Sequence, residues 1–208
     1  MTDVDSGLRD IAEIRSIMER STKFISLSGF AGIGAGAVAL AGSWAAWEMF
    51  SADRVTLTYT ATAADLQPDT RISLVLLAVV VLVLALAISW FFSRRIIRKR
   101  AEPVNGPVMR HMVLSFAVPI LVGAFITLLL FYRGPLGLVV PSMLLFYGLG
   151  IFSAGSFTFG EVRTLGVIEI ILGLTAALFP ELGLCFWAAG FGVLHIVYGG
   201  LFFRKYRQ

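Results

Sequence analysis

Six apolar stretches, each long enough to cross a lipid bilayer, constrain this chain more than any other feature of its sequence. A membrane-spanning helix needs about 20 predominantly apolar residues. With 58% hydrophobic and 14% charged residues, the chain also has too little polar surface for a soluble fold. We therefore predict an all-α, polytopic membrane protein built as a bundle of six transmembrane helices. The predicted spans cover residues 24–50, 72–93, 112–132, 137–157, 164–182 and 184–203.

Residues 1–23 are predicted to form a separate amphipathic helix in the cytoplasm, ahead of a transmembrane domain over residues 24–208. Ile11, Ile14 and Met18 fall on one stripe of such a helix, and Glu13 and Arg20 lie opposite. The segment is too acidic for a signal peptide. It either lies in the membrane interface or under the bundle, or it offers a docking surface for a cytoplasmic partner.

The basic residues predict the orientation of the chain. All of the 17 lysines and arginines except Arg54, Arg71 and Arg133 fall in the two terminal tails or in the segments after spans 2 and 4. The positive-inside rule places these segments in the cytoplasm, and an even number of spans requires both termini on one side. We expect a bacterial inner-membrane protein with both termini cytoplasmic.

The segment after span 2 has the densest positive charge. Each basic residue near a membrane surface contributes about 1 kcal/mol of attraction to anionic lipid headgroups. No aromatic residues are interleaved in a way that would indicate nucleic-acid binding. We therefore expect a lipid-headgroup site and no nucleic-acid partner. Its residues are Arg94, Arg95, Arg98, Lys99 and Arg100.

Small residues mark the faces where helices are expected to pack closely. Span 1 carries Gly32 and Gly36 in a GxxxG arrangement, which lets two helix backbones approach. The helix that packs there belongs either to the same chain or to a second copy, so self-association through span 1 stays open. Further glycines flank polar residues of spans 5 and 6. They are Gly166, Gly173, Gly192 and Gly199.

Ionisable residues inside a span are costly, and they mark functional sites by default. Glu169 in span 5 and His195 in span 6 lie roughly 8 Å and 13 Å from the cytoplasmic end, at 1.5 Å per residue. Tyr198 shares the helical face of His195, and Tyr147 in span 4 falls at a similar depth. We expect these four side chains to form one hydrogen-bonded cluster.

Two interpretations of the cluster are open. It is either a structural clasp that pins spans 5 and 6 together, or a proton-titratable or ligand-binding site. Two histidines and one cysteine give no basis for a metal or haem site, so no cofactor is expected. Outside the membrane, alternating Val55, Leu57 and Tyr59 predict a short strand or hairpin in the segment 51–71.

Two resemblances add to this interpretation. Residues 18–29 resemble a segment of uncharacterised six-span bacterial membrane proteins. The last two spans resemble the hairpins of the HdeD-like acid-resistance membrane proteins through Gly166, Gly173, Pro180, Gly190 and Gly199. These resemblances imply a bacterial inner membrane and a stress or accessory role.

The function expected from the sequence is that of a non-enzymatic accessory or regulatory protein, acting through helix–helix or lipid contacts. The alternative is a small transporter or oligomeric channel that uses the intramembrane pair Glu169 and His195. An intramembrane enzyme is a third possibility, although no nucleophile set or phosphate-binding loop is present.

Overall fold

The computed structural model describes residues 29–100, 107–158 and 160–206, and every regular element in these ranges is a helix. The all-α fold class is thereby confirmed. The predicted amphipathic helix over residues 1–23 lies outside the described residues. The long helices are α2 (Gly29–Ala52), α3 (Pro68–Arg100), α4 (Pro107–Arg133), α5 (Val139–Ala154), α6 (Gly160–Leu178) and α8 (His195–Tyr206).

Short helical segments join or precede the long helices. Two of them, α7 (Gly183–Trp187) and the π-helical segment η5 (Ala188–Leu194), run without a break into α8. A π-helical turn widens the helix and disturbs its regular hydrogen bonding. The other four are 3-10 turns in the connections. They are η1 (Ala63–Asp65), η2 (Leu136–Leu138), η3 (Gly155–Phe157) and η4 (Pro180–Leu182).

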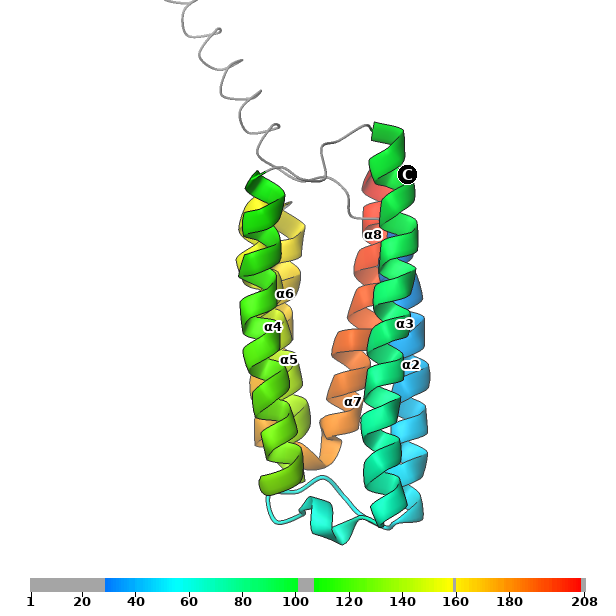
Figure 1. Cartoon of the computed structure of the whole chain (residues 1–208), viewed down its shortest axis with the longest axis vertical. Coiled ribbons are helices and arrows are strands. Elements are labelled where there is room, and N and C mark those ends of the chain that lie inside the picture. Colours follow the sequence, from blue (N-terminus) through cyan, green and yellow to red (C-terminus); the bar gives the residue numbers. More distant parts are fainter. Residues whose placement is uncertain (1–28, 101–106, 159, 207–208) are drawn as a thin grey trace, which may run out of the picture.

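Five helical stretches of the described chain are long and apolar enough to cross a membrane. They correspond to α2, α3, α4, the η2–α5–η3 stretch, and the η4–α7–η5–α8 stretch. The remaining helix, α6, has 19 residues but carries Glu161, Arg163 and Glu169. It nevertheless runs alongside α5 for most of its length (Figure 1).

The helices are arranged in two groups of three (Figure 1). In one group α2 lies between α3 and α8, and in the other α5 lies between α4 and α6. The first and last long helices therefore belong to the same group, and the chain leaves this group after α3 and returns to it through α7. We call these the α2 group and the α5 group.

Glycines set the close packing inside each group. A Cβ atom on Gly36 would lie 2.6 Å from the carbonyl oxygen of Gly192, and one on Gly199 would lie 2.5 Å from that of Gly29. Gly32 likewise faces the backbone at His195 and Gly199. Gly29, Gly32 and Gly36 thus pack against the last helix of the same chain.

Glycines also bring helix backbones into close contact in the α5 group. A Cβ atom on Gly166 would lie 2.9 Å from the carbonyl oxygen of Gly148, and one on Gly173 would lie 2.9 Å from the backbone nitrogen of Leu145. These distances are too short for any residue larger than glycine. Because Gly166 and Gly173 bracket Glu169, the close contact between α5 and α6 fixes the position of that side chain.

The two ends of the bundle differ in character. At one end, which we call the basic end, α2 begins and α3 and α8 finish (Figure 1). At the other, the loop end, residues 53–67 cross between the two groups. Leu136 N donates to Ala61 O at 2.8 Å and Gly137 N donates to Thr58 O at 2.9 Å.

The strand predicted for this loop is wrong. Residues 55–61 are irregular or bent, and none of the described residues forms a strand. Leu57 is buried, as the alternating pattern requires, but the hydrogen bonds of the segment go to the helical turn η2. Because η2 is a helical turn and not an extended segment, these two bonds do not continue into a β-ladder.

Candidate functional site

Glu169 lies at the centre of α6 and is completely buried, with 0% of its surface exposed. The sequence placed it nearer the cytoplasmic end, because the span was predicted to begin at residue 164. The helix begins at Gly160, four residues earlier, which adds about 6 Å of depth. The carboxyl group therefore lies midway along the helix.

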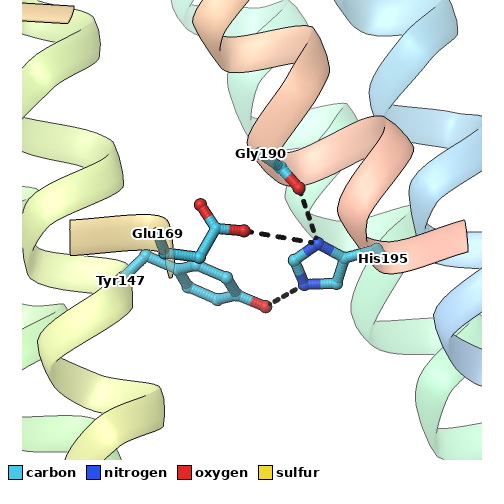
Figure 2. Close-up of polar contacts among 4 residues, drawn as sticks. All are labelled: Tyr147, Glu169, Gly190 and His195. Atoms are coloured by element: carbon cyan, nitrogen blue, oxygen red, sulfur yellow. Dashed lines mark hydrogen bonds and ion pairs between the residues drawn. The ribbon is translucent and has the colours of Figure 1, made fainter. Parts of the chain in front are cut away.

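His195 is held by a hydrogen bond at each ring nitrogen (Figure 2). Its Nε2 lies 2.6 Å from the hydroxyl group of Tyr147 on α5. Its Nδ1 lies 3.0 Å from the carbonyl oxygen of Gly190 in η5. A ring fixed at both nitrogens has one orientation, so the histidine is positioned as firmly as a catalytic or ligand-binding imidazole.

The hydrogen-bond partners of His195 determine which of its ring nitrogens carries a proton. A carbonyl oxygen can only accept, so Nδ1 of His195 must carry a hydrogen and donate it to Gly190. In the neutral ring Nε2 then accepts from the hydroxyl group of Tyr147. If Nε2 gained a proton, the same contact would reverse, with the imidazolium donating to the tyrosine oxygen. The pair Tyr147–His195 can therefore accommodate either protonation state without moving.

Glu169 has no such partner. Its Oε1 lies 3.7 Å from Nδ1 of His195, beyond hydrogen-bond distance, and neither carboxyl oxygen bonds to any other described residue. Burying a carboxyl group without a compensating hydrogen bond costs several kcal/mol. At 3.7 Å the two groups are close enough for an ion pair when His195 is protonated, but they are too far apart for a hydrogen bond. The geometry leaves the carboxyl group with unused hydrogen-bonding capacity beside an imidazole.

Gly190 makes room for the carboxyl group. A Cβ atom there would lie 2.6 Å from Oε2 of Glu169, so any larger residue would displace it. Gly190 also belongs to η5, whose π-helical turn lies in the middle of the last helix. Such turns occur frequently at functional sites. The sequence singled out Gly190 only as part of a resemblance, since π-helices have no simple sequence signal.

Tyr198 does not join the cluster of Glu169, His195 and Tyr147. It lines a separate small cavity of about 110 Å³ between α6 and α8, together with Glu161 and Lys205. Lys205 forms an ion pair with Glu161 that joins these two helices near the basic end. A shared helical face places Tyr198 one turn from His195, but the two residues contact different neighbours.

A larger cavity, of about 470 Å³, lies on the other side of the cluster, toward the loop end. Its lining is almost wholly apolar and comes from both groups, chiefly from α3, α4 and α5. Tyr147 and Phe191 form its deep wall, so the cavity adjoins the cluster through the ring of Tyr147. Sequence reasoning missed this cavity, because it depends on how far apart the two groups stand.

The basic residues after span 2 continue α3 beyond its apolar part. Arg94 stacks over the ring of Trp90 at 5.5 Å, and Arg95 over that of Phe91 at 4.5 Å. Both arginines are exposed. The side chains of Arg98, Lys99 and Arg100 lie outside the described part of the structure.

Within the described ranges, no group of three His, Cys, Asp or Glu side chains could hold a metal ion. The comparisons with known proteins add no constraint on the site. No family model matches the chain, and neither a curated protein nor a solved structure matches it.

Proposed function

We propose that the chain is a six-span protein of the bacterial inner membrane that acts as a small transporter, and that Glu169 and His195 pass a proton across the middle of the bundle. The observation that carries this proposal is the completely buried carboxyl group of Glu169. It has no hydrogen-bond partner among the described residues and lies 3.7 Å from a positioned imidazole.

The sixth span is α6. Three charged residues lower its apolar character, but Glu169 is buried against the last helix, and Glu161 is paired with Lys205 close to the start of the helix. Five apolar helices and α6 together make an even number, so both termini lie on the same side. The positive-inside rule then makes the basic end cytoplasmic.

The position of the cluster between the two helix groups supports a transport role. Tyr147 and Glu169 belong to the α5 group, whereas His195 and Gly190 follow the α2 group (Figure 2). Transporters commonly bind their substrate or coupling ion near the bilayer midplane, between two helical units and at an interrupted helix. A site shared by two groups changes its geometry whenever the groups move relative to each other.

The surroundings of the cluster give the proposed pathway a direction. Toward the basic end, the small cavity with Tyr198, Glu161 and Lys205 supplies polar side chains between α6 and α8. Toward the loop end, the wall formed by Tyr147 and Phe191 separates the cluster from an apolar cavity. Protons would therefore reach Glu169 from the cytoplasmic side in this conformation, and release to the other side would require the groups to move.

An accessory role has less support from the helix contacts. The glycines of span 1, which would offer a surface to a partner or a second copy, already pack against the last helix. Lipid contacts at the basic end, through exposed Arg94 and Arg95, fit either role. A partner that docks on residues 1–23 would favour the accessory role.

The test is proton flux into liposomes that contain the purified full-length chain and an entrapped pH-sensitive dye. After a pH jump with the membrane potential clamped, we expect the wild type to acidify the lumen faster than empty liposomes. Glu169→Gln keeps the size of the side chain and removes its acid group, so we expect flux to fall about tenfold or more. Glu181→Gln, the same change at an exposed carboxyl group, is the matched control.

Two outcomes would overturn the proposal. One is wild-type flux no greater than that of empty liposomes at several pH gradients. The other is equal flux in Glu169→Gln and Glu181→Gln, because the buried carboxyl group would then play no part. Co-purification of a stoichiometric partner that is lost when residues 1–22 are deleted would favour the accessory role instead.

A further inference from the structure

The large apolar cavity lies in the seam between the two groups. Residues from Leu74 to Leu82 of α3 form one side and residues from Ile120 to Phe131 of α4 form the other. These stretches are the early part of α3 and the late part of α4, so the cavity occupies the half of the bundle nearer the loop end. Leu57 and Leu136 close it at that end.

The cavity faces the surroundings of the bundle through the gap between α3 and α4. These consecutive helices are absent from the closely packed helix pairs, and the side chains of Val79, Leu82 and Leu128 on them line the cavity and are exposed. Among the five candidate spans of the described chain, α3 and α4 contain the two most apolar 18-residue stretches. Their outer faces are therefore in contact with lipid, and the seam opens into the hydrocarbon region of the bilayer.

Water is a poor occupant of this space. Each buried water needs two to four polar partners. The hydroxyl group of Ser43 already donates to Leu184 O, that of Tyr147 is paired with His195, and Thr127 Oγ1 has no hydrogen-bond partner among the described residues. An apolar cavity open to lipid is filled instead by the material that surrounds it.

We infer that the cavity binds one hydrocarbon chain of a membrane phospholipid, which enters sideways between α3 and α4. A volume of about 470 Å³ lies within the usual range of small-molecule sites, about 300–1,000 Å³. The lining offers an acyl chain only apolar contacts along most of its length, which is the chemistry that a hydrocarbon requires. This site is separate from the proposed proton site and does not depend on it.

The inner wall of this lipid site is a stack of aromatic rings. Trp187 lies 5.3 Å from Phe191, and Phe191 lies 4.8 Å from Tyr147, between ring centroids. A chain in the cavity would rest against the ring of Tyr147 while its hydroxyl group bonds to His195. Occupancy by lipid would thus hold the aromatic stack in the arrangement that supports the histidine.

Trp187 allows the site to be tested directly, because bromine on a lipid chain quenches tryptophan fluorescence at contact distance. The three other tryptophans, Trp44, Trp47 and Trp90, are exposed and can each be replaced by phenylalanine. The full-length single-tryptophan protein is reconstituted in phosphatidylcholine vesicles with or without bromine midway along one acyl chain. We expect the emission of Trp187 to fall by about half in brominated vesicles.

Two substitutions on α3 decide whether the quenching comes from the cavity. Ala78→Phe fills the cavity, since Ala78 lines it, whereas Ala87→Phe adds the same ring on the opposite, lipid-facing side of α3. Ala78→Phe should remove most of the quenching and Ala87→Phe should leave it unchanged. Ala124→Phe, from the α4 side, repeats the test if Ala78→Phe does not elute as a monodisperse protein.

Absence of quenching in the single-tryptophan protein would overturn the inference. Equal quenching in Ala78→Phe, Ala124→Phe and Ala87→Phe would also overturn it, because the bromine would then reach Trp187 from another side. The quenching experiment and the proton-flux assay are separate measurements. Failure of the lipid site and failure of the proposed transport function are therefore distinguishable.

Discussion

The contacts inside the two helix groups differ from those between them. Inside each group, glycines bring backbones into contact, as between Gly36 and Gly192 or between Gly148 and Gly166. Between the groups lie a large apolar cavity, a second, smaller cavity, and a few hydrogen bonds at His195 and in the loop. Dense packing resists deformation, whereas a seam with cavities does not.

This difference indicates where the molecule can move. Each group is expected to behave as a rigid unit, and relative motion is expected at the seam that contains Glu169. Substitutions inside a group should therefore affect stability, whereas substitutions in the seam should affect function more than stability. The following predictions test this division, beginning with the largest effect.

The largest loss of stability is expected inside the α2 group. In Gly199→Val the new side chain begins 2.5 Å from the carbonyl oxygen of Gly29 and 2.8 Å from the backbone nitrogen of Ile33. Overpacking of this kind costs about 3 kcal/mol, and here the neighbours are backbone atoms that cannot rotate away. Gly200→Val is the neighbouring control, because nothing lies within 4 Å of its Cβ position.

The free energy of unfolding is measured by titrating SDS into the protein in mixed micelles and following helix content. We expect Gly199→Val to be strongly destabilised and Gly200→Val to remain within about 0.5 kcal/mol of the wild type. Similar midpoints for the two variants would show that the close contact between α2 and α8 contributes little to stability.

The second prediction concerns the seam, where a substitution is expected to raise the free energy of unfolding. Glu169→Met replaces a completely buried carboxyl group, which has no hydrogen-bond partner among the described residues, by an apolar chain of similar length. Because the polar group no longer has to be desolvated, we expect the free energy of unfolding to rise by about 1–2 kcal/mol. Proton flux should be lost in the same variant. A less stable Glu169→Met protein would mean that the carboxyl group has a stabilising partner.

The positions of the helices could be predicted from the sequence, but which helices pack against each other could not. Apolar length and glycine spacing depend on residues that are close in the chain, so the five apolar helices and the packing faces at Gly32 and Gly36 could be predicted. Which helix meets that face depends on the path of the whole chain. The sequence therefore could not assign the partner of span 1, and it gave no sign of the cavity between α3 and α4.

The candidate site could also be predicted only in part, as its individual residues show. Glu169 and His195 stand out because they are polar within apolar spans, and equal depth suggested that Tyr147 lies near them. Tyr198 was grouped with them by helical spacing, but it faces Glu161 and Lys205 instead. The π-helical turn at Gly190 changes the register of the last helix, and periodic spacing cannot anticipate that change.

The third prediction concerns the hydrogen bond between the groups. Tyr147→Phe keeps the ring that lines the cavity but removes the hydroxyl group that pairs with Nε2 of His195. Hydrogen bonds between membrane helices contribute about 0.6 kcal/mol on average, so the loss of stability should be small. The nitrogen-15 chemical shift of Nε2 should change clearly, and Tyr132→Phe, at an exposed tyrosine of α4, should leave it unchanged.

The smallest effect is expected at the loop end, where acid should loosen the contact between the groups. Asp65 accepts hydrogen bonds from the backbone nitrogen and the hydroxyl group of Thr62, at 2.7 Å and 3.1 Å. These bonds, the backbone one foremost, lower the pKa of Asp65 below its ordinary value of 3.8. The folded pKa lies below the unfolded one, so the stabilisation is complete above the unfolded value and is lost as pH falls through the folded pKa.

Hydrogen exchange is the measurement that follows this loss, because η1 orders the loop whose Ala61 and Thr58 carbonyl groups hold η2. We expect the backbone amides of Leu136 and Gly137 to lose protection below pH 4 when rates are corrected for intrinsic exchange. Asp65→Asn should show the same loss at neutral pH. Because Asp65 is fully exposed, the change should stay local, and amides at the glycine contacts of α2 should keep their protection. Simultaneous loss at both places would show that the loop and the rigid groups unfold as one unit, and the division between packed groups and a soft seam would then fail.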